Sequence, residues 1–381
     1  MMSLTGFLSL KLSKNMLLIL RAIVKQIIAG MLTAVLLTAA ACDNLLIRDQ
    51  PLPTAMAELK PESPDWLSVY FSDPDSTTGS NYRGGPDEAL AESIRKARVS
   101  VDMAMHFLNL WSIRDALIET HRRGVPVRVV TESDNLDVDE IIELKEAGIP
   151  VLGDRREGRM HNKFVVIDRQ EVWTGSINLS VMGAYYHDNN LLHLKSAPIA
   201  ENYTVEFEEM FLEDRFGPGS PANTPNQFSN VNGVNVETYF SPEDHPAHRI
   251  KQLIQNARES IDFLAYSFTL DELADAMVAS SRHGVQVRGV FDEGQSRANA
   301  GTEFYNLLSA GLDVRLDGNE NKMHHKIIII DESIVITGSY NFSVNAETVN
   351  DENVIIIHSK DFAKKYEQEF TRVFIKSRAS Q

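Results

Sequence analysis

The chain has 381 residues, of which 43% are hydrophobic and 24% charged, a composition typical of globular proteins. Its single cysteine excludes an internal disulfide, and its length suits two ordinary domains or one large duplicated one. The formal charge of −16 argues against general affinity for duplex nucleic acid, because non-specific DNA binding depends mostly on cations. Residues 1–41 contain four lysine or arginine residues and no acidic residue, so residues 42–381 carry a formal charge of −20, which is −16 less the four positive charges. A local basic cleft is still compatible with this charge.

The N-terminus has the order of a secretory signal. Arg21 and Lys25 precede an apolar run over residues 27–37, and small residues then lead to Cys42. We predict a signal peptide over residues 1–41. The ending LTAAAC resembles a bacterial lipoprotein cleavage site, which implies that Cys42 is lipidated; the alternatives are a plain signal cut near Ala41 and an uncleaved anchor helix.

Residues 42–65 contain four prolines and few apolar clusters, which predicts a tether. Together with the signal, this predicts a protein of the cell envelope, on the periplasmic or extracytoplasmic face and anchored through Cys42.

From residue 66 onward the sequence repeats itself, with a period of about 160 residues that indicates a duplicated domain. Each copy alternates strands with amphipathic helices, which predicts an α/β sandwich. The matching helix-then-strand segments are 87–105 with 248–266, 110–130 with 270–290, and 144–152 with 307–315. We place the first repeat at 66–212, a linker rich in Pro, Gly, Asn and Ser at 213–235, and the second repeat at 236–381.

One motif occurs in both copies. Residues 161–178 read HNKFVVIDRQEVWTGSIN, and residues 324–341 read HHKIIIIDESIVITGSYN. The apolar runs FVVI and IIII have strand length, and the polar residues after them predict hairpin turns. Because residues two apart on a strand face the same side, each His projects together with its Lys, and the returning strand brings Ser and Asn back to their level.

These side chains suit a phosphodiester better than a metal ion. Lysine offers only hydrogen-bond donors, and His-x-Lys supplies one usable ligand where zinc needs three or four.

The two copies resemble the phospholipase D superfamily, whose signature is H-x-K-x4-D followed by G-S/G-x-N. The resemblance covers nearly everything from about residue 66 to the end. It implies a duplicated phospholipase D-like α/β sandwich, in which two halves related by a pseudo-twofold axis share one active site, and a phosphohistidine intermediate formed without metal or cofactor. The catalytic residues that it implies are His161, Lys163, Asp168, His324, Lys326, Asp331 and Glu352. The implied phosphate-binding residues are Ser176, Asn178, Ser339 and Asn341.

Some of these roles have alternatives. Asp168 and Asp331 lie at strand ends, where bracing a turn is a more natural role than chemistry, and the two serines are also candidate hydrogen-bond donors to neighbouring groups. The usual order of the family makes His161 the nucleophile and His324 the acid. Glu352 follows the second motif, where the first copy has Asn189; we expect this carboxylate behind His324, which would favour the reverse order.

The expected substrate is a phospholipid, cleaved or transferred at the membrane by a monomer, because both motifs are in one chain. The alternative is a secreted or periplasmic endonuclease, for which the candidate basic groove is Arg155, Arg156, Arg159 and Lys322. A non-catalytic binding protein is a third hypothesis. The aromatic residues Phe107, Trp111, Tyr185 and Tyr186 are candidates for the substrate entrance, with core packing as the alternative.

Overall fold

The computed structural model describes residues 66–76 and 81–379. The predicted signal peptide, Cys42 and the tether lie outside these residues. Within the described part, no helix is both long and apolar enough to cross a membrane.

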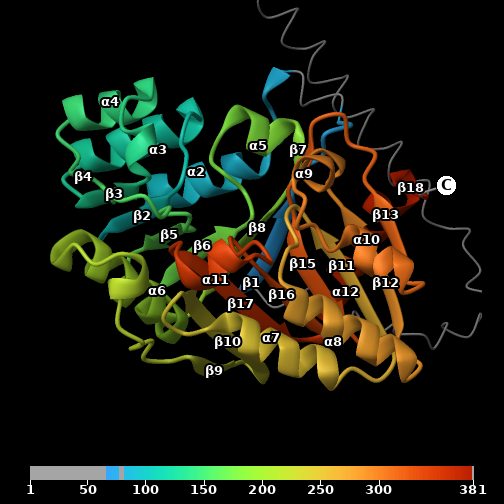
Figure 1. Cartoon of the computed structure of the whole chain (residues 1–381). Helices are drawn as coiled ribbons and strands as arrows, with labels where there is room; N and C mark the ends of the chain where they lie inside the picture. Colours follow the sequence, from blue (N-terminus) through green and yellow to red (C-terminus); the bar gives the residue numbers. More distant parts are fainter. Residues whose placement is uncertain (1–65, 77–80, 380–381) are drawn as a thin grey trace, which may run out of the picture. The chain divides into compact units, whose positions relative to one another are not determined.

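The first half forms a seven-stranded sheet in the order β1-β8-β6-β5-β2-β3-β4 (Figure 1). Strands β2, β3 and β4 run parallel, and the others pair antiparallel. The strands are β1 (Leu67–Phe71), β2 (Val101–Met105), β3 (Val127–Thr131), β4 (Val151–Gly153), β5 (Lys163–Ile167), β6 (Glu171–Gly175) and β8 (Asn190–Lys195). The helices are α2 (Pro86–Lys96), α3 (Trp111–Arg122), α4 (Asp139–Glu146), α5 (Val181–Tyr185) and α6 (Ala197–Glu213), with short 3-10 turns at Ser133–Asn135 and Gly217–Gly219.

The second half repeats this sheet and adds a strand at each edge. Its order is β18-β13-β12-β11-β15-β16-β17-β10-β9, and its central seven strands match the first sheet one for one. The strands are β9 (Phe228–Val231), β10 (Val234–Ser241), β11 (Ser260–Ala265), β12 (Gln286–Phe291), β13 (Asp313–Leu316), β15 (Lys326–Ile330), β16 (Ile334–Gly338), β17 (Glu352–His358) and β18 (Arg378–Ala379). The helices are α7 (Pro246–Gln255), α8 (Asp271–Arg282), α9 (Glu293–Ala298), α10 (Phe304–Ser309), α11 (Val344–Thr348) and α12 (Lys360–Lys376). The expected linker is only partly irregular, because β9 and the start of β10 form a hairpin within it.

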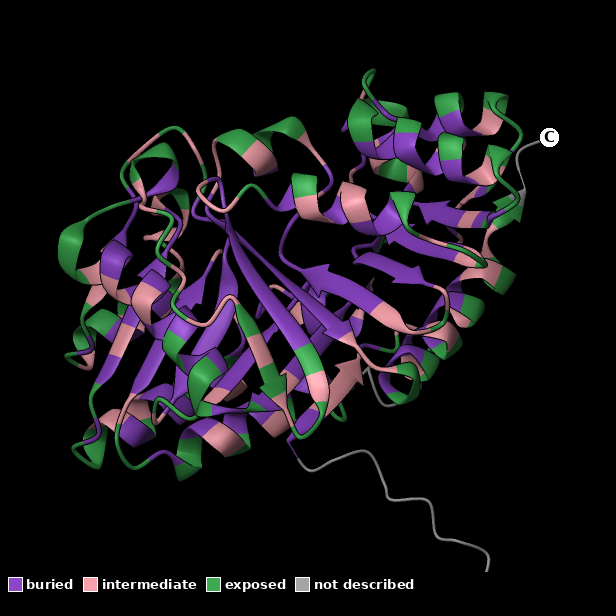
Figure 2. Cartoon of the chain, turned by 90° about the horizontal axis from the view of Figure 1, so that it is seen from below, coloured by how far each residue is buried: buried purple, intermediate pink, exposed green. Residues whose placement is uncertain are grey.

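Three apolar cores hold these layers together. One lies under α2, α3 and α4, another under α7 and α8, and a third between the halves, where α6 and α12 pack. In this shared core, Phe240 of the second half contacts Phe164 and Tyr203 of the first. The central strands are buried on both faces (Figure 2), which explains why KIIII is continuously apolar.

The halves meet through reciprocal backbone pairing next to each motif. Strand β7 (His187–Asp188) pairs with β14 (Lys322–Met323), and Met160 forms the matching bridge with Asp351. The His324 amide donates to the carbonyl of Asp188 and the His161 amide to that of Asp351, both at 2.9 Å. This exchange is the pseudo-twofold arrangement that the duplication predicts.

Candidate active site

The two motif lysines open strands β5 and β15, and each is held by its own histidine residue. Lys163 Nζ donates to the carbonyl of His161 at 2.9 Å, and Lys326 Nζ donates to that of His324 at 2.8 Å. Both lysines are 1% exposed. The four side chains therefore lie where the two sheets exchange backbone contacts.

Each histidine ring is flanked by an aromatic ring from the end of the neighbouring strand. His106, after β2, lies 4.8 Å from the ring of His161, and Tyr266, after β11, lies 4.6 Å from that of His324. His187 is a further neighbour of His324, at 6.1 Å. Sequence reasoning missed these three residues. The internal repeat would have located two of them, since residues 105–107 (MHF) align with residues 265–267 (AYS).

Burial and the lysine charges set the protonation of both histidines. Burial lowers the pKa of His161 well below its usual value, and the nearby positive charges of Lys163 and Lys326 lower it further. The pKa of His324 is lowered in the same way by burial, Lys326 and Lys163. Each ring is thus influenced by the lysine of the other half, so the copies form one site, and both rings are neutral at neutral pH.

Burial also lowers the pKa of the lysines. That of Lys163 falls to about 7, although Glu352 acts in the opposite direction. Burial and the proximity of Lys163 lower the pKa of Lys326. Two crowded lysine side chains that form no ion pair among the described residues favour binding of a phosphate, whose negative charge stabilises their protonated forms.

The carboxylate that we expected behind His324 lies behind His161 instead. Glu352 Oε2 is 2.6 Å from His161 Nδ1, whereas His324 Nδ1 faces the amide oxygen of Asn189 at 2.9 Å. The expectation was wrong because the residues just before each motif pair with the segment that follows the motif of the other half. Each histidine therefore contacts a side chain from the other half: Glu352 for His161, and Asn189 for His324. This exchange was not visible from spacing along the chain.

The motif serines support these two partners. Ser176 Oγ donates to Asn189 Oδ1 at 2.9 Å, and Ser339 hydrogen-bonds Glu352. Their hydroxyls are therefore used behind the histidines, which is the alternative role and differs from the phosphate contact that the resemblance implies. The glycine before each serine is required, since a Cβ on Gly175 would lie 2.4 Å from the Asn190 carbonyl oxygen.

The motif asparagines retain unused hydrogen-bonding capacity. The side-chain oxygens of Asn178 and Asn341 are buried and have no partner among the described residues. Because an amide can turn to present either its oxygen or its NH2, both side chains are suited to an incoming phosphate.

Asp168 and Asp331 lie away from this centre, at the far end of β5 and β15, which strand geometry places roughly 20 Å from the histidines. Asp168 Oδ1 accepts from the backbone amides of residues 98, 99 and 100 at 2.6–3.1 Å. Asp331 does the same for residues 258, 259 and 260. The structure thus contradicts a chemical role for these aspartates and supports the turn-bracing alternative.

The candidate basic groove is partly neutralised. Arg155 pairs with Asp214, and Arg156 pairs with the buried Asp351 across the halves. Arg159 and Lys322 are exposed and form no ion pair within the described part of the chain. Two isolated cations do not form the continuous basic groove that a nuclease would need.

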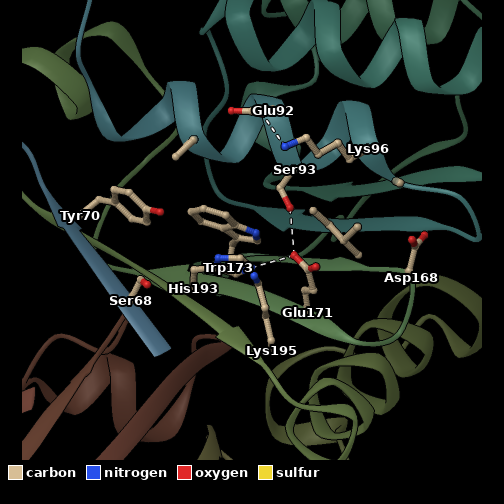
Figure 3. Close-up of a pocket in the computed structure, with 13 residues that line it drawn as sticks. Ser68, Tyr70, Glu92, Ser93, Lys96, Asp168, Glu171, Trp173, His193 and Lys195 are labelled. Carbon is tan, nitrogen blue, oxygen red and sulfur yellow. Dashed lines mark hydrogen bonds and ion pairs between the residues drawn. The ribbon is translucent and has the colours of Figure 1, made fainter. Parts of the chain in front are cut away.

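A separate cavity of about 730 Å³ lies on the outer face of the first sheet (Figure 3). Tyr70, Trp173 and His193 stack along it, and Glu171 Oε2 lies 2.7 Å from His193 Nε2. Asp168 is the only predicted site residue that lines it, so this cavity is distinct from the histidine centre.

No group of three or more His, Cys, Asp or Glu side chains within residues 66–76 and 81–379 is arranged to hold a metal ion.

Comparison with known proteins supports the duplication. A family model described as cardiolipin synthase, PLD-like domain, matches residues 90–211 and again 250–374. A phospholipase D of Rickettsia typhi is 35% identical over 208 residues, which cover 55% of this chain and 92% of that protein. A mitochondrial cardiolipin hydrolase of Xenopus tropicalis is 34% identical over 131 residues, 34% of this chain and 62% of that protein.

A solved structure shows the same fold. The phosphatidylserine synthase of Haemophilus influenzae Rd KW20 superposes with a TM-score of 0.59, covering 77% of this chain and 85% of that one, at 14% identity. Its likeness therefore extends over both halves of the chain described here.

Proposed function

Since the chain belongs to the family of PLD-like domains found in cardiolipin synthase, we propose that it is a phospholipase D-type phosphodiesterase that hydrolyses phospholipids or transfers their phosphatidyl group. The relatives named phospholipase D and cardiolipin hydrolase support this substrate class. The pairing of Arg155 and Arg156 with acids disfavours the nuclease alternative. Two complete motifs disfavour a non-catalytic role.

One observation carries the mechanism: the 2.6 Å contact between Glu352 and His161 Nδ1. A carboxylate holds the proton on Nδ1, which leaves the lone pair of Nε2 free to attack phosphorus and stabilises the positive charge that the ring then acquires. His324 has only the neutral Asn189 oxygen at the same position. The structure therefore supports the usual order, with His161 as nucleophile.

In the first step, His161 Nε2 forms a bond to phosphorus while the bond from phosphorus to the headgroup oxygen breaks. His324 donates a proton to that leaving oxygen, for which it must be protonated in the complex with the anionic substrate. In the second step, neutral His324 takes a proton from water or an alcohol, whose oxygen attacks phosphorus and releases His161. Lys163, Lys326 and the two asparagines would bind the non-bridging oxygens, whose charge grows in each transition state.

We extend the proposal to location and assembly. A secretory signal with a lipidated Cys42 would hold the enzyme at the extracytoplasmic face, beside its substrate. A monomer suffices, because one chain supplies both halves of the site.

The test compares the variants His324→Asn and His161→Asn, in EDTA, with a phospholipid that carries a labelled phosphatidyl group and an activated leaving group. Such a leaving group departs without an acid, so His324→Asn should accumulate labelled enzyme that is stable in alkali and labile in acid, as phosphohistidine is. His161→Asn should acquire no label. Label found only on His161→Asn would reverse the order of the histidines, and failure of the intact enzyme to cleave any phospholipid would refute the proposed function.

A further inference from the structure

Among the large apolar side chains exposed on the first half, three lie on segments next to the motif residues or their neighbours: Tyr82 at 40%, Trp111 at 52% and Met182 at 41%. We call them the aromatic collar. The ring of Tyr82 lies 6.2 Å from that of Trp111 and 5.6 Å from that of the buried Tyr185, so Tyr82 and Trp111 form one surface against α5, the short helix that also carries Met182. Contiguous exposed apolar surface of this kind marks an interaction site.

The collar is attached to the candidate active site. Met182 lies on α5, four residues after Asn178, and Trp111 lies five residues after His106, the neighbour of His161. Hydrogen bonds join the two segments: the Asn109 amide donates to the carbonyl of residue 179, and the amide of residue 181 donates to Asn109 Oδ1, both at 3.0 Å. The collar therefore adjoins the loop that carries Asn178.

The second half has polar residues in place of Trp111 and Met182, although Val344 on α11 is exposed. Trp111 corresponds to Asp271, the first residue of α8, and Met182 corresponds to Asn345 on α11. Catalysis uses both copies of the motif, so the shared chemistry does not require apolar groups on only one of them. A separate role, specific to the first half, explains this asymmetry.

Three exposed cations lie either next to the collar in sequence or beside the candidate active site. Arg83 adjoins Tyr82 in sequence, while Arg159 and Lys322 immediately precede the two motif segments. Arg159 is close enough to His161 to lower the pKa of its imidazole, and Lys322 has the same effect on His187. Within residues 66–76 and 81–379 none of the three forms an ion pair, although the chain as a whole carries a charge of −16.

We propose that the aromatic collar, with Arg83, Arg159 and Lys322, is the surface by which the protein docks on an anionic lipid bilayer. This proposal rests on the proposed function: both histidines are buried, so a bilayer lipid reaches them only if the membrane lies against the rim of the site. Trp and Tyr favour the headgroup region, where the ring is apolar and the polar tip is wet, and each unpaired cation near the surface attracts anionic lipid.

Trp111 makes the proposal directly measurable. The chain has three tryptophans, and the other two, Trp66 and Trp173, are 6% and 2% exposed. The full chain is bound to phosphatidylglycerol vesicles that contain lipids brominated in their acyl chains, which quench tryptophan only on contact. We expect quenching and a blue shift that both disappear in Trp111→Phe. If Trp111 is not quenched in vesicle-bound protein, the collar does not enter the bilayer and the proposal is wrong.

Kinetics give a second test. Trp111→Ser and Tyr82→Ser should each lower phospholipid cleavage on anionic vesicles about tenfold, the effect of roughly 1.4 kcal/mol of lost binding. They should leave cleavage of a short-chain, monomeric phospholipid unchanged. Leu212→Ser and Phe228→Ser are matched controls, because these residues are 64% and 67% exposed but lie on α6 and β9. Equal losses in the controls, or equal losses on monomeric lipid, would contradict docking through the collar.

The two proposals fail in distinguishable ways. Cleavage of phospholipid without quenching of Trp111 would leave the enzyme assignment intact and remove the docking surface. Quenching without cleavage of any phospholipid would retain the docking surface and remove the proposed activity.

Discussion

Glu352 and Asn189 occupy equivalent positions in the two copies, yet they make the two motif histidines chemically different. One ring is backed by a carboxylate that can share its proton, and the other by a neutral amide. In both cases the buried partner also hydrogen-bonds a motif serine, so its orientation is fixed before substrate arrives. In the proposed mechanism, this near-symmetric fold thereby provides a nucleophile and an acid at fixed positions.

The pH dependence of cleavage should report this pair. Burial raises the pKa of Glu352 to about 7, against the opposing effect of Lys163, and burial lowers the pKa of Lys163 to about 7. Activity should rise as Glu352 ionises and fall as Lys163 loses its proton, so kcat/KM should follow a narrow bell centred near pH 7.

Glu352→Gln should flatten the acidic limb of this bell and lower kcat by about 100-fold or more. Asn350→Ala is the control: Asn350 donates a long hydrogen bond of 3.5 Å to Glu352 Oε1, which lowers the pKa of that carboxyl, so the variant should keep the acidic limb and move it to slightly higher pH. An unchanged acidic limb in Glu352→Gln would show that another group titrates there.

At the scale of elements, the motif aspartates show that a spacing repeated in both copies of the motif stabilises the fold. The turn residues Asp168 and Arg169 both have positive φ, as do their counterparts Asp331 and Glu332. Each aspartate ties its hairpin to the segment that leads into β2 or β11. The strand that begins at the motif lysine, two residues after the histidine, is thereby fixed at its remote end, which keeps the register that presents both side chains to the site.

Asp168→Asn and Asp331→Asn should each lower the free energy of unfolding by about 1–3 kcal/mol, because a charged acceptor of several amide hydrogen bonds becomes neutral. Asparagine tolerates positive φ, so backbone strain does not add to the loss. Urea denaturation measures the effect, and kcat per folded molecule should not change. Glu332→Gln, on the same type of turn and exposed, is expected to stay within about 0.5 kcal/mol of the wild type. A large loss of kcat in folded Asp168→Asn would restore a chemical role for that residue.

At the scale of the whole molecule, buried acids meet where the halves join. Glu206 of α6 and Glu243, which follows β10, lie within hydrogen-bonding reach of one another. Burial, and then their mutual repulsion, raises the pKa of Glu206 well above its usual value, and burial raises that of Glu243 to about 8. A neutral carboxyl at this junction can donate a hydrogen bond, whereas two carboxylates would repel.

This raised pKa has a definite sign for stability. A carboxyl that binds its proton more tightly in the folded state increases the free energy of unfolding. This stabilisation is fully present below the unfolded pKa of about 4.5 and is lost as the pH rises towards 8. Glu243→Gln mimics the protonated form, so it should be at least about 1 kcal/mol more stable than the wild type at pH 9 and nearly equal at pH 5.

Glu237→Gln provides the opposite control. Burial opposes ionisation of Glu237, but hydrogen bonds from Arg249, His358 and Tyr239 outweigh it and lower the pKa to about 2. This variant should lose stability at both pH values. A Glu243→Gln variant that is destabilised at pH 9 would mean that the carboxylate is stabilised in the folded protein.

The sequence by itself determined the duplicated α/β architecture and most of the site. Each copy has a His-x-Lys segment followed by a turn and a Gly-Ser-x-Asn segment. The strand period, the turn and the register of this hairpin are local properties, so the spacing of residues along the chain predicts them. The positions of His161, Lys163, His324 and Lys326 followed from them. For Asp168 and Asp331 the strand-end position indicated turn bracing only as an alternative to the chemical role that the resemblance implies, and the structure decided between the two.

Only the tertiary structure decided which residue backs which histidine. Each motif strand pairs with the segment that follows the other motif, so Glu352 reaches His161 across 191 residues of chain. The same pairing brings His187 beside Lys322 and joins Arg156 to Asp351. Such contacts depend on how the halves pack about their common axis, which a pattern within either half does not encode.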